Sequence, residues 1–341
     1  MGAFLGAAIG DAMGGPVESQ HAARIKKYYG ELTGLLPYRK PPGLIDLKPG
    51  YALHPEAGSI TDDTFIRIDI TRFFLATRPP RTPRLLAGWL LENADFRNWW
   101  PPAVEALRRI DRGEVSAEQG GLKHAPGGGG AWWTPVGILY AAQPAQAAAA
   151  VRDLCRPWKA PLERDIIGAV HAGTAECLRE GATADSVVEV ILQHSGPLAR
   201  RLFARAAEIG RSARSGDELW RRLYENCLVK QATTEIDGPM PPREEPVDYA
   251  EGSYSSFLFA EQQPLALAAF VYAKGDPRAA ILRAAMNGRD ADSTASNAGG
   301  WAGGLHGESG LPKEWVRAVC EVNRREVDLR DLAERLLETP V

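Results

Sequence analysis

The sequence lacks several features that would assign it to a special class of protein. Its apolar stretches are all shorter than the roughly 18–20 residues that a membrane-spanning helix needs. Its formal net charge is only −3, so no strong field favours nucleic acid or an anionic membrane. The apolar N-terminus contains Asp11 and lacks a basic start, unlike a signal peptide. We therefore expect a soluble, cytoplasmic protein with no nucleic-acid or membrane partner.

Cysteine and histidine are also scarce, and neither forms a recognisable framework. The four cysteines are far apart, so neither a disulfide scaffold nor a zinc-type pair is expected. The six histidines show no zinc-type spacing either. We predict that the cysteines are buried thiols. They are Cys155, Cys177, Cys227 and Cys320.

The chain does have the composition of a globular protein, with 45% hydrophobic and 24% charged residues. Helical periodicity dominates, whereas strand alternation is scarce. Apolar residues spaced by three and four predict a helix from Pro161 to Arg179. Asp276 followed by Pro277 predicts an N-cap and a first helical residue. Further helices are predicted at Thr183–His194 and Asp217–Leu228, from Leu311-Pro312 and from Asp328.

Proline clusters mark loops, of which Gln231 to about Ser256 is the longest. No segment has the composition of a domain linker. We therefore predict an all-α, compact, multi-helix fold in a single domain that spans residues 1–341.

Two segments carry unusually many glycines for helices, namely Gly2–Gly15 and Ala291–Gly307. Each glycine inside a helix costs about 0.5–1 kcal/mol relative to alanine, so a tertiary reason is needed. One such reason is close approach of backbones around a compact site. The alternative is ordinary tight packing of helices.

The first candidate site is Thr61-Asp62-Asp63, which precedes an apolar helical pattern. The simplest interpretation is a helix start, with Thr61 as N-cap and the negative aspartates near the positive, N-terminal end of the helix dipole. Adjacent aspartates flanked by hydroxyl groups are also typical of a site for a hard cation such as Mg²⁺ or Mn²⁺. Both interpretations stay open from this segment alone.

The second candidate site is Asp290-Ala291-Asp292-Ser293. It does not fit an EF-hand loop, because the sixth position would be Ala295 and the twelfth Trp301. Asp292 or Ser293 as a helix N-cap is the alternative to a cation site. Four clustered aspartates repel one another unless they are paired or bound to metal. If the two segments meet in space, two divalent cations about 3.5–4 Å apart would neutralise them.

Three motifs, in this order, resemble those of the ADP-ribosylglycohydrolase family. They are the segment from Gly2 to Glu18, Thr61-Asp62-Asp63-Thr64, and the segment from Gly288 to Thr294 with its glycine-rich continuation to Gly307. A weaker match runs from Gly127 to Gly137. The resemblance covers nearly the whole chain.

The resemblance implies an all-α domain with a central cleft that holds two divalent cations, Mg²⁺ or Mn²⁺. It implies hydrolysis of an N- or O-glycosidic bond at ribose C1, on an ADP-ribosylated protein or a small ADP-ribose conjugate. Glu18 would be a ligand or the acid/base group, unless it is a solvent-exposed glutamate at a helix end. The implied catalytic residues are Glu18, Asp62 and Asp292. The implied ligands are Thr61, Asp62, Asp63 and Asp292 for one ion, and Asp290, Asp292 and Ser293 for the other.

The resemblance is weakest in the loop expected to bind the substrate. In this loop, residues 127–133, the asparagine and arginine usual in the family are missing. In the third motif, Arg289 stands where glycine is usual. The N–H groups of the loop glycines can still bind a phosphate. Trp132 and Trp133 suit stacking on a base, although packing of both rings in the core is an equal alternative. The implied substrate-binding residues are Gly127, Gly128, Gly129, Gly130, Trp132 and Trp133.

These departures leave other functions open. The substrate can be a different N-ribosyl compound, such as a nucleoside or nucleotide. The chain can also be a catalytically silent, ligand-binding relative, although its intact aspartates favour activity. A metal-dependent phosphohydrolase is a weaker alternative, since paired metals also serve phosphate chemistry.

Overall fold

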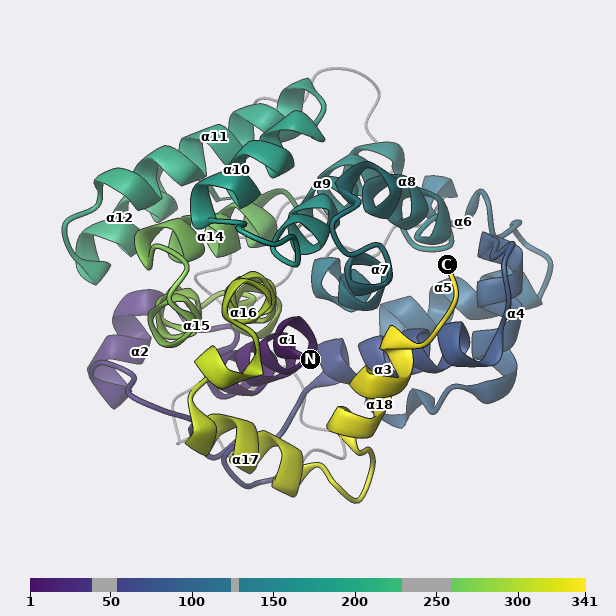
Figure 1. The fold of residues 1–341 in the computed structure, drawn as a ribbon, viewed down its shortest axis with the longest axis horizontal. Coiled ribbons are helices and arrows are strands. Elements are labelled where there is room, and N and C mark those ends of the chain that lie inside the picture. The colour runs from purple at the N-terminus through teal and green to yellow at the C-terminus, as the bar shows by residue number, and fades with distance from the viewer. Residues whose placement is uncertain (39–53, 124–128, 229–258) are drawn as a thin grey trace.

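The computed structural model describes residues 1–38, 54–123, 129–228 and 259–341. These residues fold into helices, and the only β-type pairing among them is an isolated bridge between His21 and Gly288 (Figure 1). The predicted all-α fold is therefore confirmed. The α-helices are α1 (Gly2–Gly14), α2 (Ala22–Tyr29), α3 (Asp62–Ala76), α4 (Pro83–Asn93), α5 (Pro101–Asp111), α6 (Gly120–Lys123), α7 (Thr134–Leu139), α8 (Pro144–Leu154), α9 (Pro161–Glu176), α10 (Ala184–Gln193), α11 (Pro197–Ser212), α12 (Gly216–Asn226), α14 (Phe259–Tyr272), α15 (Pro277–Met286), α16 (Ala291–His306), α17 (Lys313–Val322) and α18 (Leu329–Leu337). Short 3-10 helices are η1 (Gly15–Val17), η2 (Phe96–Asn98), η3 (Gly130–Trp133) and η5 (Glu308–Gly310).

Local capping chemistry explains where several helices begin. Asp276 accepts a hydrogen bond from the backbone N–H of Ala279 at the start of α15, and Asp328 does the same at the start of α18. Thr183 caps α10 in the same way. These predicted starts are confirmed, whereas α12 begins earlier than predicted, with Ser215 as its cap.

Glycines allow α1 and α16 to pack with their backbones in contact, side by side near the centre of the molecule (Figure 1). A Cβ atom added at Gly6 would lie 2.2 Å from the carbonyl oxygen of Gly299. One added at Gly10 would lie 2.0 Å from that of Ala295. No side chain fits in so little space. The glycines of both segments therefore allow the two helix backbones to approach closely, which was one of the two explanations considered from the sequence.

This antiparallel contact brings the C-terminal end of α1 to the N-terminal end of α16. A Cβ atom added at Gly14, the last residue of α1, would lie 2.2 Å from the carbonyl oxygen of Ala291, the first residue of α16. The start of α3 joins them, because the backbone N–H of Thr61 donates to Asp11 Oδ2 at 2.8 Å. Three helix ends thus converge on one point.

Two further predictions concern the thiols and the long loop. Three cysteines are buried as predicted, whereas Cys320 is only partly buried. The predicted loop from Gln231 to Ser256 lies outside the described residues. Among the residues that are described, no helix is both long enough and apolar enough to cross a membrane.

Candidate metal centre

The two acidic segments meet, although 230 positions separate Asp63 from Ser293 in the sequence. The Ser293 hydroxyl donates a hydrogen bond to Asp63 Oδ2. Thr61 Oγ1 lies 3.0 Å from Asp292 Oδ2. The prediction that the two segments come together in space is therefore confirmed.

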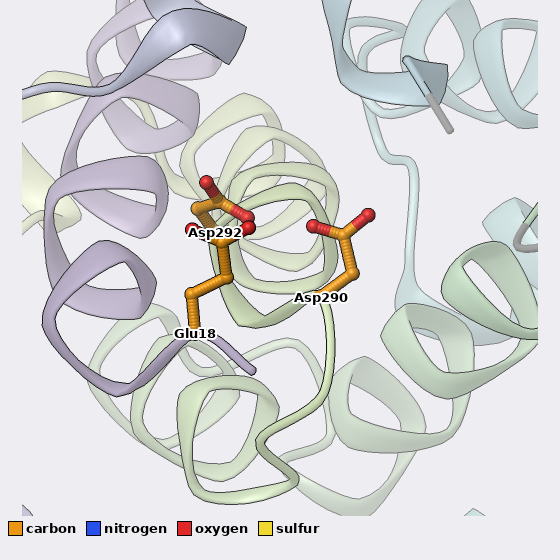
Figure 2. A group of neighbouring side chains, drawn as sticks. All are labelled: Glu18, Asp290 and Asp292. Carbon is orange, nitrogen blue, oxygen red and sulfur yellow. The ribbon is translucent and has the colours of Figure 1, made fainter. Parts of the chain in front are cut away.

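A trio of carboxylates forms the centre of this meeting point. One carboxylate oxygen each from Glu18, Asp290 and Asp292 lies within 4.8 Å of the others (Figure 2). Glu18 directly follows η1, whereas Asp290 and Asp292 belong to the start of α16. Glu18 is only 2% exposed, which excludes the alternative of a solvent-exposed glutamate.

The donor set fits a hard divalent cation. Every candidate ligand atom is an oxygen, as Mg²⁺ and Mn²⁺ prefer. Burial raises the pKa of Asp290 well above its usual range, and the neighbouring charge of Asp292 raises it further. Glu18 and Asp63 act in the same direction. Like charges confined in this way are stabilised by a bound cation, so the cluster can hold a metal ion.

The start of α3 contributes to the site without capping its own helix. Thr61 is at the N-cap position, as predicted, but its side chain makes no capping bond. Instead its hydroxyl donates to Asp11 Oδ1 at 2.5 Å. Asp62 and Asp63 are both buried, at 6% and 3% exposure, in the first turn. An aspartate can interact with the helix dipole from the protein surface, so the dipole alone does not explain why these two carboxylates are buried.

The start of α16 also differs from the simple capping alternative. Its N-cap residue is Asp290, and no side chain makes a capping bond there. The alternative that Asp292 or Ser293 is the N-cap is therefore wrong. Asp292 Oδ1 instead accepts a hydrogen bond from the backbone N–H of Ser293 at 2.9 Å, which fixes the direction of the carboxylate.

Asp11 is a site residue that the sequence analysis did not select. It is fully buried and accepts two hydrogen bonds from Thr61. Burial raises its pKa to about 6, with a further contribution from Asp292, while hydrogen bonds from Thr61 and Thr64 oppose the shift. The available signal was a lone aspartate in a helix otherwise made of small and apolar residues.

The described part of the predicted substrate loop continues into η3, which packs against α3 and α16, the helices that begin at the acidic segments. Gly127 and Gly128 are outside the described residues. Gly129 has a left-handed backbone, with φ at +71°, and leads into η3. The carbonyl oxygen of Gly130 lies 2.7 Å from Nε2 of the buried His171. The role of these glycines in substrate binding remains a prediction.

The two tryptophans of η3 are buried and both pack edge-on against Trp158, and Trp132 also hydrogen-bonds to the acidic cluster. Trp132 is 1% exposed, and its Nε1 donates to Asp63 Oδ1 at 2.5 Å. Trp133 is fully buried and packs edge-on against Trp158, with ring centroids 5.9 Å apart. Trp132 thus supports a candidate ligand, while Trp133 contributes to the core. Their predicted stacking on a substrate remains a prediction.

Arg289 precedes Asp290 and takes a backbone conformation that usually favours glycine, with φ at +60°. Its guanidinium is buried and forms a two-point ion pair with Glu261, at 2.5 and 3.1 Å. The cost of this backbone, about 1–3 kcal/mol, is therefore offset by a paired, well-anchored side chain. The ion pair fixes the loop from which Asp290 extends.

Replacing Trp132 with phenylalanine is expected to lower kcat/KM about tenfold or more. The change removes one hydrogen bond to a charged group, worth about 1.5–3 kcal/mol, from a candidate ligand. Trp99→Phe is the matched control, because Trp99 Nε1 donates to Asp69, a buried aspartate outside the cluster. Equal effects of the two substitutions on kcat/KM would contradict a specific role for Trp132.

The fold and the site together define a helical protein built around a buried carboxylate cluster that can hold a metal ion. The family model for ADP-ribosylglycohydrolase matches residues 1–340, so the chain belongs to that family. It is also similar to an uncharacterized protein of Archaeoglobus fulgidus, with 26% identity over 345 residues. That alignment covers 98% of this chain and 94% of the archaeal protein.

Proposed function

We propose that the chain is a metal-dependent glycohydrolase that cleaves the N- or O-glycosidic bond at ribose C1. The proposed substrate is an ADP-ribosylated protein or a small ADP-ribose conjugate. The observation that carries the proposal is the convergence of Glu18, Asp290 and Asp292 with the start of α3 in a buried, oxygen-only cluster. Membership of the family supports the same reaction class. The family match over residues 1–340 also supports a single domain over the chain.

We further propose two divalent cations, Mg²⁺ or Mn²⁺, as cofactors. Several carboxylates packed together supply more negative charge than one divalent ion neutralises, which favours two ions. When bound, such ions supply Lewis-acid chemistry and fix the ribose diol and a water molecule. The proposed ligands are Thr61, Asp62, Asp63 and Asp292 for one ion, and Asp290, Asp292 and Ser293 for the other.

The chain's own residues would then provide the acid/base chemistry. Hydrolysis at an anomeric carbon passes through an oxocarbenium-like state, and a carboxylate takes the proton of the attacking water. Glu18 is suited to this role, because it is buried beside Asp290 and Asp292. In the proposal Asp62 and Asp292 also contribute to catalysis by holding the sugar and water in place.

Release of free ADP-ribose tests the reaction. The purified protein is incubated with peptides ADP-ribosylated on arginine or on serine, in Mn²⁺, in Mg²⁺ or in EDTA. We expect release from at least one conjugate in a divalent cation and none in EDTA. Release of ribose from nucleosides or nucleotides, with no release of ADP-ribose, would favour the alternative of another N-ribosyl substrate.

The metal content of the protein tests the silent-relative alternative. After dialysis against Mn²⁺ and removal of free ions, elemental analysis should find about two ions per chain. A silent relative is expected to retain little Mn²⁺. A protein that retains the ions but hydrolyses no conjugate would contradict the proposed activity while leaving the metal site intact.

A further inference from the structure

Arg67 connects three of the elements that surround the acidic site. It belongs to α3, four residues after Asp63, and it is fully buried. Its Nε donates to the carbonyl oxygen of Ala131 in η3 at 3.1 Å. One terminal nitrogen donates to Thr64 Oγ1 at 3.2 Å and the other to Ser296 Oγ in α16. A single side chain thus joins α3, η3 and α16.

The connection continues into α1. The Ser296 hydroxyl accepts from Arg67 and donates to the carbonyl oxygen of Ala7 at 2.9 Å. Thr64 accepts from Arg67, and its hydroxyl lowers the pKa of the neighbouring Asp11. Asp11 in turn accepts from Thr61. Arg67 is therefore connected to the proposed ligands through hydroxyl groups.

Arg67 is charged, yet its donors go to a carbonyl and two hydroxyl oxygens and not to a carboxylate. A buried guanidinium is costly unless opposite charges lie nearby. Burial lowers the pKa of Arg67 below its usual range, and the opposite charges of Asp11 and Asp63 oppose that shift. The guanidinium is thus held among the carboxylates by neutral acceptors, while the oxygens of Asp11 and Asp63 accept hydrogen bonds from other residues.

We propose that Arg67 is a positioning residue that serves as a resident counter-charge for the acidic cluster. It holds the carboxylates together before any divalent cation binds, and its positive charge weakens the binding of that cation. The inference rests on the proposed function only in taking the cluster to hold divalent cations. It predicts opposite effects of one substitution on the stability of the metal-free protein and on metal affinity.

Two variants of the full chain separate charge from hydrogen bonding. Arg67→Met removes the charge but keeps most of the side-chain length, whereas Arg67→Lys keeps the charge and loses the forked donor geometry. Mn²⁺ affinity is measured by calorimetry, and thermal unfolding is followed by circular dichroism in EDTA and in Mn²⁺. Ser296→Ala is the control that removes one hydrogen bond of Arg67 and leaves its charge.

We expect Arg67→Met to melt at a lower temperature than the wild type in EDTA and to bind Mn²⁺ about tenfold more tightly. Its gain in melting temperature on adding Mn²⁺ should exceed that of the wild type. Arg67→Lys and Ser296→Ala should keep Mn²⁺ affinity close to the wild-type value. Weaker or unchanged Mn²⁺ binding in Arg67→Met would overturn the proposal and leave Arg67 a purely structural residue.

If Arg67→Met does not fold in EDTA, refolding in Mn²⁺ replaces the affinity measurement. Recovery of helical structure on adding Mn²⁺ supports the proposal, because the metal then replaces the lost charge. No recovery, while Arg67→Lys folds, overturns it. A wild-type protein that binds no Mn²⁺ would overturn the proposed function together with this inference. Wild-type binding without tighter binding in Arg67→Met overturns the inference alone.

Discussion

Replacing Gly10 with alanine should destabilise the protein strongly, although alanine is the better helix former. Helix propensity alone favours alanine over glycine by about 0.5–1 kcal/mol. At this position, however, a Cβ atom would lie 2.0 Å from the carbonyl oxygen of Ala295 and 2.7 Å from the backbone nitrogen of Ser296. Neither is the end of a flexible side chain, so α1 and α16 would have to move apart.

The expected loss exceeds that of an ordinary overpacked core residue, which is about 1–3 kcal/mol. A loss of about 3 kcal/mol corresponds to a fall of roughly 6–12 °C in melting temperature at about 2–4 °C per kcal/mol. Circular dichroism at 222 nm measures it. Metal binding should weaken as well, because the same helix pair holds Asp11 beside Asp292.

Gly88→Ala is the matched control. Gly88 lies in the interior of α4, and a Cβ atom added there meets no atom within 4 Å. This variant should be unchanged or more stable by about 0.5–1 kcal/mol. If Gly10→Ala were as stable as Gly88→Ala, α1 and α16 could not be packed backbone to backbone.

The helix starts were predictable because their chemistry is local. An aspartate before proline, as at Asp276-Pro277, carries its capping bond within three residues of sequence. The glycine-rich segments were equally visible, but their partner was not. A run of glycines predicts that something approaches closely, whereas the identity of α16 as the partner of α1 depends on packing across the whole chain.

The site shows the same limit. Charge repulsion among the aspartates predicted that the two acidic segments need a common partner, and the family resemblance predicted that they meet. Neither argument could place Arg67, because an arginine between buried isoleucines has no local signature of its partners. Thr61 shows the converse: its N-cap position was predictable, but its bond to Asp11 depends on a contact across 50 residues.

Replacing Asp292 with alanine should abolish hydrolysis and metal binding and leave a folded helical protein. Asp292 is the residue shared by both proposed ion sites, and it lies within 4.8 Å of Glu18 and Asp290. Losing it should lower kcat/KM by roughly 10²–10³-fold or more, the cost of losing a group that stabilises transition-state charge. Calorimetry with Mn²⁺ should detect little or no binding.

Stability distinguishes this loss from general damage. The negative charge of Asp292 raises the pKa of both Asp11 and Asp290, so in metal-free protein it repels its neighbours. Removing it relieves that repulsion, and the melting temperature in EDTA should be retained or raised. The wild type should gain melting temperature on adding Mn²⁺, and the variant should not.

Asp69→Ala is the matched control for Asp292→Ala, and it is expected to change stability and leave metal binding intact. Asp69 is also a buried aspartate, but it belongs to α3, accepts hydrogen bonds from Trp99 and Arg72, and lies outside the cluster. Its loss should lower stability by about 1–3 kcal/mol and leave Mn²⁺ affinity unchanged. Asp292 carries the proposed chemistry only if these two variants diverge. Mn²⁺ binding that survives Asp292→Ala would remove the carboxylate cluster as the metal site.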